Sequence, residues 1–517
     1  MHPIVQEVTG GQSPEALASK LAGEPGLILL RSALFDSTHA RYSFLAARPF
    51  LFFRAAGSRC ELETLEPPVV RVQYGNPWSV LDGLMARYEL LDELDLPFPL
   101  GGCFGYWGYD LKNFVEPRLP RHAINDLELP DCWVGFYDSL LVFDHTLGKT
   151  WVVATGLAAD GSRCERRAHR QVEQWTTLLS KNPSDWRASD SPSPRGEGWG
   201  EGDRLVRLPR VDRTAQHRHH PASPHATLSR ADFLARVTRA QAYIRAGDIY
   251  QVNLAQRLDV PFSHLGWELF QRLTAVSPAP FSAFIDCGEF QVVSSSPELF
   301  LRLSGPHIET RPIKGTRPRS ADLTRDAQLT YELQTSAKEM AELVMITDLL
   351  RNDLGKICEF GSVQVPELVR LERYPQVQHL VSTVEGRLRR DVTHFAALAS
   401  CFPGGSITGA PKIRAMEIID ELEPVTRGPY TGALGYLGFN RESQLSITIR
   451  SAICLAGRAY FYAGAGIVAD SEPAAEYEET LAKARGFFEA LRLDAYREQS
   501  APSRSAERGG SKIRGVT

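Results

Sequence analysis

A lysine in the segment RPIKGTRPR lies where it could act as a nucleophile. Pro312 and Gly315 constrain the backbone on either side of Lys314, and three arginines within the same nine residues raise the local positive charge. Neighbouring cations and partial desolvation lower the pKa of a lysine and free its amine for attack. The same residues would also suit a basic turn on the surface, so this segment alone leaves both interpretations open.

Two stretches of helical sequence each carry a pair of glutamates. In SAKEMAELVMITDLLRND, Glu339 and Glu342 share one helix face beside an apolar stripe, and in AAEYEETLAKARGFFEAL, Glu476 and Glu479 repeat the spacing. Four carboxylates from two facing helices suit Mg²⁺, which takes one or two protein carboxylates and leaves positions for water and an anionic substrate. The alternative is two solvated faces with ion pairs such as Glu479–Lys483.

Two glycine-rich segments could bind an anion through the main chain. CFPGGSITGAPKIRAMEIIDEL passes from a glycine-rich loop into a helix that opens near Pro411, and the free N–H groups of a helix start attract carboxylate or phosphate. YFYAGAGIVADSEP is a β-run broken by Gly464 and Gly466, where a ligand could approach the backbone. Neither segment is a phosphate-binding loop of the Walker type, because no Gly-Lys-Ser/Thr follows, and GAGIVA lacks the strand-to-helix fingerprint of dinucleotide binding.

Two further side chains have the chemistry of a substrate site. Arg450 ends the alternating SITIR in a hairpin predicted over 430–453, and an arginine projecting from a strand can clamp a carboxylate, although most such arginines face solvent. Glu298 follows a proline in the β-rich run VVSSSPELFLRL. A half-buried glutamate of this kind has a raised pKa and can serve as a general acid.

The elements that must position these residues divide the chain into four parts. Residues 1–175 alternate strand-like and helical patterns, and 228–494 do so more regularly. Residues 181–226 are rich in Pro, Gly, Ser and charge, a composition that cannot bury enough apolar surface to offset the ordering entropy, so we expect a flexible linker or insertion. The polar, glycine-containing tail over 495–517 is expected to be disordered.

Composition excludes several classes of protein. The 517 residues are 43% hydrophobic and 23% charged, and the formal net charge of −4 gives no global footprint for nucleic acid or an anionic membrane. No apolar run approaches the roughly 18 residues needed to cross a bilayer, and no signal-peptide pattern opens the chain. The eight cysteines form no C-x-x-C pair, so reduced thiols in a cytoplasmic protein are expected rather than zinc or disulfides.

Taken together, the motifs resemble the chorismate-utilising family, which includes anthranilate synthase component I, aminodeoxychorismate synthase component I, and the isochorismate and salicylate synthases. GDIYQVNLAQR, SSSPELF, RPIKGTRPR, KEMAELVMITDLLRNDLGK, CFPGGSITGAPKIRAMEIIDELEP, YTGALGYLG, SITIR and AGAGIVADSEPAAEYEETLAKA occur in the family's order over about 228–490. Residues 1–175 match more weakly, through LLRSA and GGCFGYWGYDL. The resemblance implies an α+β fold of two intertwined lobes, with antiparallel sheets packed as a sandwich and helices outside.

The resemblance also implies roles for the residues singled out above. Glu342 and Glu479 match Mg²⁺ ligands, with Glu339 and Glu476 in support, and Glu298 matches the acid that protonates the departing C4 hydroxyl of chorismate. Chorismate is a dianion, so one carboxylate can complete the metal's coordination while the other needs a cation and backbone donors. The substrate contacts implied by the resemblance are Gly315, Thr316, Tyr430, Arg450, Gln251 and the backbone of Gly464, Ala465 and Gly466.

Two positions discriminate among the branches of the family. Members that add water have a lysine base where this chain has Gln251, which disfavours the isochorismate and salicylate branch. Anthranilate synthases typically read P-I-A-G-T where this chain has P-I-K-G-T. In aminodeoxychorismate synthases the lysine is implied to attack C2 and expel the C4 hydroxyl, after which ammonia adds at C4. Lys314 is therefore the expected covalent nucleophile, and anthranilate synthase component I is the alternative.

The sequence also bears on partners and regulation. No cysteine lies in a nucleophile-elbow context, so ammonia is expected from solution or from a separate glutamine amidotransferase subunit. Conversion of the product to 4-aminobenzoate is expected to be carried out by another protein. Arg31 replaces the acid of the family's Leu-Leu-Glu-Ser tryptophan motif, which argues against feedback inhibition by tryptophan. If the chain were a non-catalytic regulatory subunit, we would expect either the set of carboxylates or Lys314 to have been lost. Both are intact. The basic tail and the linker are the only sequence features that could support DNA binding.

Overall fold

The computed structural model describes residues 2–8, 12–32, 40–91, 94–180, 224–374 and 377–492. The predicted linker therefore lies outside the described residues except for its last three positions, and the predicted tail lies outside them entirely. In the described ranges, no helix combines the length and the apolar character needed to cross a membrane. All eight cysteines lie in these ranges and are free thiols.

The structure contains two twelve-stranded antiparallel sheets. The first, sheet A, combines strands from the N-terminal and C-terminal halves of the chain. Its central junction is between β2 and β13, where Leu29 is paired with Phe284. Across the sheet the strands follow in the order β1 (Ile4–Val8), β10 (Lys149–Ala154), β9 (Ser139–Asp144), β3 (Tyr42–Ala46), β2 (Ile28–Arg31), β13 (Phe281–Asp286), β14 (Phe290–Ser296), β23 (Ser451–Leu455), β24 (Arg458–Ile467), β12 (Gln251–Pro261) and β11 (His225–Ala226), with β20 (Gly409–Ala410) also paired to β12.

Sheet B is built in the same way, and its junction between the two halves of the chain is β7 against β21. There Gly105 faces Gly435 across the ladder, where a Cβ on either residue would collide with the neighbouring backbone. The order is β17 (Ile313–Pro318), β19 (Val377–Arg387), β16 (His307–Arg311), β15 (Leu299–Ser304), β22 (Glu442–Ile447), β21 (Ala433–Gly438), β7 (Gly102–Trp107), β8 (Cys132–Tyr137), β4 (Leu51–Ala56), β5 (Arg59–Leu65) and β6 (Pro68–Tyr74), with β18 (Gln364–Arg373) paired to β19.

Alternating apolar residues explain why the sheets stack. Along β9, Leu140 and Val142 lie in the core between the sheets, while Leu141 and Phe143 lie in a second core on the outer face of sheet A. Successive side chains of a strand point to opposite faces, so a strand that is apolar throughout must be covered on both sides. The predicted α+β sandwich of intertwined halves is confirmed, because strands from both halves form each sheet.

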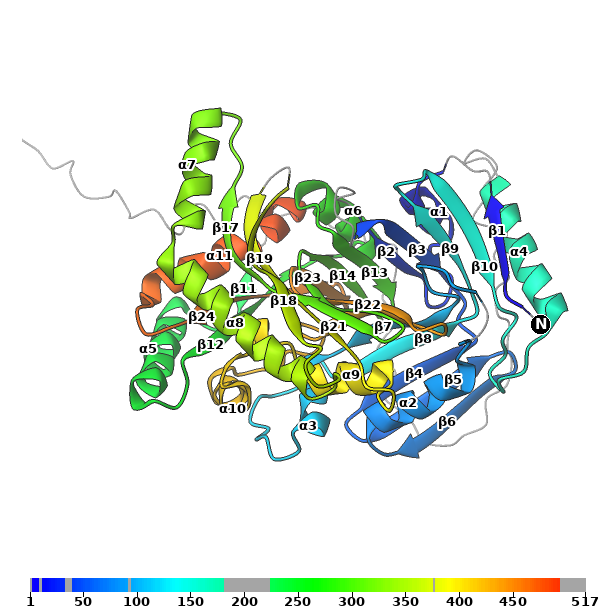
Figure 1. Ribbon diagram of the computed structural model, residues 1–517, viewed down its shortest axis with the longest axis horizontal. Coiled ribbons are helices and arrows are strands. Elements are labelled where there is room, and N and C mark those ends of the chain that lie inside the picture. The colour runs from blue at the N-terminus through cyan, green and yellow to red at the C-terminus, as the bar shows by residue number, and fades with distance from the viewer. Residues whose placement is uncertain are drawn as a thin grey trace, which may run out of the picture.

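Helices cover the outer faces (Figure 1). Helix α8 lies against β18 and β19 of sheet B, and α11 lies against β24 of sheet A and against α5 and α6. In Figure 1, α7 rises from the end of the molecule beside β17. The helices are α1 (Pro14–Lys20), α2 (Pro77–Tyr88), α3 (Lys112–Val115), α4 (Glu165–Ser180), α5 (Arg230–Ala246), α6 (Gly266–Val276), α7 (Leu323–Gln334), α8 (Ala337–Gly355), α9 (His394–Cys401), α10 (Lys412–Leu422) and α11 (Pro473–Ala490).

Local sequence signals set the ends of the helices that matter for the site. The Ser336 hydroxyl accepts a hydrogen bond from the Glu339 amide at the start of α8, and α11 begins at Pro473. Ser229 is the N-cap of α5, and Gly247 ends this helix with φ of 84°. A left-handed residue at a helix end favours glycine.

Two local predictions were wrong. Strand β24 continues without interruption through Gly464 and Gly466, because both residues keep their ladder pairing with β12. Arg450 does not project from a strand: β22 ends at Ile447, and Arg450 lies in the passage from sheet B to β23 of sheet A, with φ of 52°. The alternation of SITIR continues into the sequence of this crossover, so the pattern could not reveal where the strand ends.

A buried ion pair ties three of the segments around the candidate site together. The Arg427 guanidinium donates two hydrogen bonds to Glu423, of 2.6 and 2.8 Å, and both side chains are at most 4% exposed. The same guanidinium donates to the carbonyls of Asn253 in β12, at 2.8 Å, and of Ile407 in the glycine-rich loop, at 3.1 Å. Glu423 in turn accepts from the Ala255 amide at 2.9 Å.

Removing one partner of this pair is expected to be far more costly than removing a surface acid. Glu423→Ala leaves a buried guanidinium uncompensated, so we expect it to lower the free energy of unfolding by about 3–5 kcal/mol. The control is Glu421→Ala, whose side chain is 44% exposed and pairs with Arg239, and we expect it to cost at most about 1 kcal/mol. Urea unfolding of both variants measures the difference, and equal losses would contradict this account.

Candidate active site

Lys314 lies in β17 at a break in the strand pairing. The register between β17 and β19 shifts between Lys314 and Thr316, so that Gly315 is the extra residue of a β-bulge. Gly315 has φ of 70°, and a Cβ there would lie 2.7 Å from Leu333 and 3.1 Å from Glu339. Glycine is therefore required at this position, and the bulge sets the direction of the neighbouring lysine.

The Lys314 amine is largely enclosed. Its side chain is 13% exposed, and Nζ lies 3.8 Å from Oε2 of Glu342. Burial lowers its pKa, and the positive charge of Lys483 adds to this, whereas Glu342 and Glu298 act in the opposite direction. The sequence predicted that desolvation and neighbouring cations lower this pKa; both causes are present, but the cation is Lys483 rather than an arginine of the segment. Each of those arginines pairs with an acid of its own: Arg311 with Glu372, Arg317 with Glu339 and Arg319 with Asp326.

The four glutamates of α8 and α11 face one another across this lysine. Lys338 of α8 reaches Glu476 of α11 at 3.9 Å, and the charge of Glu479 raises the pKa of Glu342 in addition to the larger effect of burial. Each carboxylate has a cationic neighbour: Glu339 has Arg317 at 3.3 Å, Glu342 has Lys314, Glu476 has Lys338, and Glu479 has Lys483 at 2.7 Å. The predicted Glu479–Lys483 ion pair is thus present.

These donors fit Mg²⁺ in chemistry. Carboxylate oxygens are the ligands that a hard cation prefers, and burial raises the pKa of Glu342 and of Glu476 although each has a cationic neighbour. Within the described residues, no three acidic, histidine or cysteine side chains converge on one point. The position next to each carboxylate is occupied by a lysine or arginine side chain: Lys314, Arg317, Lys338 and Lys483.

Glu298 lies where it could supply a proton. It is buried, in the turn between β14 and β15, and burial raises its pKa to about 7, an effect that a hydrogen bond from Ser406 and the charges of Lys314 and Lys483 partly oppose. The sequence predicted a half-buried glutamate with a raised pKa, and the structure shows stronger burial than that. A carboxyl group that titrates near neutral pH can hold a proton and release it during a reaction.

An unpaired arginine marks the anion-binding end of the site. Burial lowers the pKa of Arg450, and no acidic side chain among the described residues forms an ion pair with it. It lines a cavity of about 580 Å³ with His379, Tyr374 and Pro297, the residue before Glu298. A partly buried cation without a counter-charge is costly, so this cavity suits an anionic ligand.

The other predicted substrate contacts are Tyr430, in the turn before β21, and Gly464, Ala465 and Gly466 of β24. Tyr430 stacks on Tyr462, with ring centroids 4.9 Å apart, and burial raises its pKa to about 12. A Cβ added to Gly464 would lie 3.2 Å from the Tyr430 hydroxyl. Gly464 and Gly466 are partly accessible whereas Ala465 between them is buried, so the two glycines present one face of β24 to the site.

Sequence reasoning missed two residues here. His379 of β19 lies 2.8 Å from the Thr316 hydroxyl through Nδ1, and burial together with the charge of Arg450 lowers its pKa to about 4, so the ring is neutral at pH 7. Lys483 donates to the Gly464 carbonyl at 2.9 Å as well as to Glu479. The helical spacing predicted the contact of Lys483 with Glu479 but not its contact with Gly464. Nothing in VQHLVS distinguished His379 from an ordinary strand residue.

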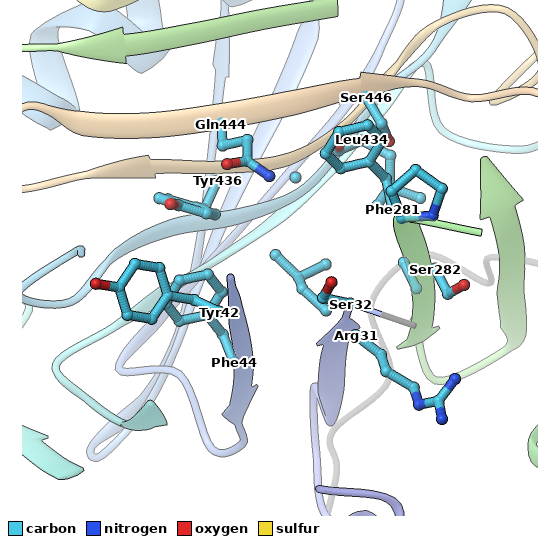
Figure 2. Close-up of a pocket in the computed structure, with 14 residues that line it drawn as sticks. Arg31, Ser32, Tyr42, Phe44, Phe281, Ser282, Leu434, Tyr436, Gln444 and Ser446 are labelled. Atoms are coloured by element: carbon cyan, nitrogen blue, oxygen red, sulfur yellow. Dashed lines mark hydrogen bonds between the residues drawn. The ribbon is translucent and has the colours of Figure 1, made fainter. Parts of the chain in front are cut away.

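Arg31 lies beside a second cavity, of about 360 Å³, between the two sheets. Figure 2 shows its side chain extending away from Tyr436 and Gln444, and its guanidinium pairs with Glu15 of α1. Ser32, Tyr42 and Phe281 also line this cavity. The expectation that tryptophan does not regulate this chain stays a prediction.

The fold and the site together are those of a chorismate-utilising enzyme. The family model described as chorismate binding enzyme matches residues 31–489, so the chain belongs to that family.

Named relatives divide between two activities. The chain is 37% identical over 490 residues to anthranilate synthase component 1 of Acetivibrio thermocellus, covering 95% of each chain. It is 40% identical over 468 residues to aminodeoxychorismate synthase component 1 of Klebsiella aerogenes, covering 90% of this chain and 93% of that one. The crystal structure of anthranilate synthase component I from Streptococcus pneumoniae TIGR4 superposes with a TM-score of 0.70 at 29% identity, covering 87% and 92%. Both named activities include the amination of chorismate, but the two enzymes form different products.

The raised pKa of Glu298 should be visible in the pH dependence of stability. Between its ordinary pKa of 4.5 and about 7, the native state holds a proton that the unfolded chain has lost, so the stability due to this group falls as pH rises through that interval. Glu298→Gln lacks this slope. We expect its free energy of unfolding, relative to the original protein, to gain up to about 3 kcal/mol between pH 5 and 8. Urea unfolding at four pH values tests this, and a difference that is constant with pH would contradict it.

Proposed function

We propose that this protein catalyses the Mg²⁺-dependent amination of chorismate to 4-amino-4-deoxychorismate through a covalent bond to Lys314. The observation that carries the proposal is the enclosed Lys314 amine, whose pKa is lowered, placed between Glu298 and Glu342 at a glycine bulge. A basic turn on the surface, the alternative interpretation of this segment, does not account for a side chain that is only 13% exposed.

Binding of the substrate follows from its two carboxylates. Arg450 would supply a partly buried cation for the enolpyruvyl carboxylate, and the Tyr430 hydroxyl and the backbone of Gly464, Ala465 and Gly466 would supply neutral contacts. The ring carboxylate is assigned to the end of the site that Glu342 and Glu479 form. Gly315 and Thr316 would lie beside the ring.

In the covalent step, Nζ of Lys314 forms a bond to C2, the two ring double bonds both shift by one position, and the C4–O bond breaks. Glu298 gives its proton to the departing hydroxyl, which leaves as water, and recovers a proton from the new C2 ammonium. Ammonia then forms the bond to C4, both double bonds shift back, and the C2–N bond breaks while one ammonia proton passes to Lys314. The sum is chorismate plus ammonia giving aminodeoxychorismate plus water. A lysine that occupies C2 accounts for nitrogen ending at C4.

Glu342 and Glu479 would hold the Mg²⁺ ion, with Glu339 and Glu476 in support. When bound, the ion supplies a Lewis acid that withdraws electron density through the ring carboxylate. The chain's own cations would have to move aside for this, since Lys314, Lys338 and Lys483 now neighbour these carboxylates.

Ammonia is proposed to come from a separate glutamine amidotransferase subunit, because the relatives are named as component 1. The product would then serve 4-aminobenzoate and folate synthesis after a lyase acts on it. The second candidate is anthranilate synthase component I, which the name of the Acetivibrio thermocellus relative favours. Lys314 is the residue that argues against it.

The first test is a product assay with the purified chain, chorismate, Mg²⁺ and excess ammonium at mildly alkaline pH. We expect a species with the mass of aminodeoxychorismate and no fluorescent anthranilate. Lys314→Ala should reduce formation of this product by at least about 100-fold, since it removes the nucleophile of the covalent path. Intact-protein mass spectrometry of the acid-quenched reaction should show the mass of chorismate less water attached to the original protein and absent from the variant.

The matched control is Arg319→Ala, which removes a nearby cation whose ion pair with Asp326 lies outside the site. It should leave the product and the adduct unchanged. Anthranilate as the main product of the original protein would transfer the assignment to the second candidate. Full activity of Lys314→Ala would remove the covalent path.

The metal requirement has its own test. EDTA treatment should abolish amination and added Mg²⁺ should restore it, and Glu479→Gln should raise the Mg²⁺ concentration for half activity by about tenfold or more, because it removes a charged ligand. Calorimetric titration of Mg²⁺ in the presence of chorismate gives the same comparison without turnover. Glu478→Gln, one residue away and exposed, is the control, and an equal effect of both variants would contradict the ligand assignment.

A further inference from the structure

Strand β6 is exposed along its whole length. It is the last strand of sheet B, so among the described residues only β5 pairs with it, and its outer edge has no partner strand. In Figure 1, β6 lies at the rim of the molecule beyond β5. Every residue of Pro68–Tyr74 is exposed, although four of them have large apolar side chains. These four are Val69, Val70, Val72 and Tyr74, with exposed fractions of 39%, 57%, 45% and 76%.

An edge strand of this kind is normally protected. Its unpaired N–H and C=O groups can pair with any other extended chain, and folded proteins block such edges with lysines, bulges or inward-pointing charges. Strand β6 has a single charged residue, Arg71, and its one proline, Pro68, stands at its start. Its register with β5 runs unbroken from Tyr74 to Pro68, so no bulge twists the edge away. The edge is therefore expected to be covered in solution.

Alternation places three of the apolar side chains in one row, beside a charged row on β5. The apolar row consists of Val70, Val72 and Tyr74. The residues directly opposite them on β5 form the charged row, which consists of Glu63, Glu61 and Arg59. This second row is balanced, since Glu61 pairs with Arg59 at 2.8 Å and with Arg54 of β4 at 3.3 Å, and Arg54 also pairs with Glu63. An apolar row beside a balanced charged row has the arrangement of an interface centre and its rim.

The symmetry of two identical edges limits how they can pair. Antiparallel pairing of β6 with its own copy requires a two-fold axis perpendicular to the sheet, so one residue must lie opposite itself. An axis at Arg71 would place two guanidinium groups opposite each other, which is destabilising. An axis at Val70 would place Pro68, which has no N–H, opposite Val72. Axes nearer to either end of the strand would pair fewer residues, so the axis that remains is at Val72.

We propose that β6 pairs with β6 of a second copy of this chain, about a two-fold axis at Val72. In this register Val70 lies opposite Tyr74 of the second copy, and Arg71 lies opposite Gln73, so no like charges face each other. The two apolar rows meet at the centre, and the balanced charged rows form the rim on either side. Because each copy contributes the same edge, the pairing closes at a dimer and does not continue into a fibre.

The first test is the mass of the full chain as a function of concentration, measured by analytical ultracentrifugation. One strand pairing buries a small area, so we expect a reversible change from one chain to two in the micromolar range. Val72→Lys would place two ammonium groups opposite each other, and we expect it to weaken dimerisation at least about tenfold. Val72 is 45% exposed, so this substitution removes no core side chain.

The matched control is Val69→Lys, on the other face of the same strand. The new charge would lie opposite Gly75 of the second copy rather than opposite itself, so we expect a change in the dissociation constant of less than about threefold. Both variants should aminate chorismate as the original protein does, because β6 contributes no residue to the candidate active site. The inference therefore does not depend on the proposed function.

Disulfide formation tests the register. The exposed native thiol is first removed by Cys164→Ser. In that background Val72→Cys should link two chains under mild oxidation, because directly opposite residues have Cα atoms about 4.5–5.5 Å apart, within the reach of a disulfide. Val70→Cys is the control: its copy lies four residues farther along the paired strands, about 13 Å away, so no disulfide should form. Non-reducing electrophoresis and intact mass measure both.

The outcomes distinguish the possible occupants of this edge. A chain that stays monomeric at every concentration and forms no cross-link through Val72→Cys would mean that another segment or another protein covers β6, and it would overturn the inference. A dimer that Val72→Lys leaves intact would place the interface elsewhere and overturn it as well. A cross-link through Val70→Cys but not through Val72→Cys would contradict the register, and assemblies larger than two chains would contradict closure by a two-fold axis.

Discussion

The site depends on one buried guanidinium, that of Arg427. Its hydrogen bonds reach β12 through Asn253, the glycine-rich loop through Ile407, and Glu423, which itself holds the Ala255 amide. Its charge also lies 4.7 Å from the ring of Tyr109 and 5.8 Å from that of Tyr430. Segments from separate parts of the chain thus share one charged centre, and because burying it without Glu423 would be prohibitive, their relative positions are fixed together.

The charged side chains of the site also compensate one another. Four glutamates and several cations share a region that is partly shielded from water, so each charge raises or lowers the pKa of its neighbours. Burial and Lys483 lower the pKa of Lys314, while Lys314 and Lys483 both limit the rise in the pKa of Glu298. An amine with a lowered pKa and an acid with a raised pKa therefore arise from the same arrangement.

Much of this could be predicted from sequence, but only where the signal is local. Glu339 and Glu342 share a helix face because of their spacing, and Gly315 adjoins Lys314 along the chain, so both relations were visible in the sequence. The burial of Arg450 was not, since it depends on a crossover between two sheets that a strand pattern cannot reveal. The arginines near Lys314 were misjudged for a similar reason: Glu372 and Asp326, which neutralise two of them, are distant in sequence or lie in the next helix.

The passages between the two sheets give the candidate site its geometry. Glu298 lies in the turn from β14 of sheet A to β15 of sheet B, and Arg450 lies in the return passage from β22 of sheet B to β23 of sheet A. The two passages are joined by main-chain hydrogen bonds, from the Ser295 amide to the Arg450 carbonyl at 3.0 Å and from the Ile447 amide to the Glu298 carbonyl at 3.1 Å. Because the acid and the arginine lie on connections that two stacked sheets hold side by side, their separation is set by the stacking of the sheets rather than by either segment alone.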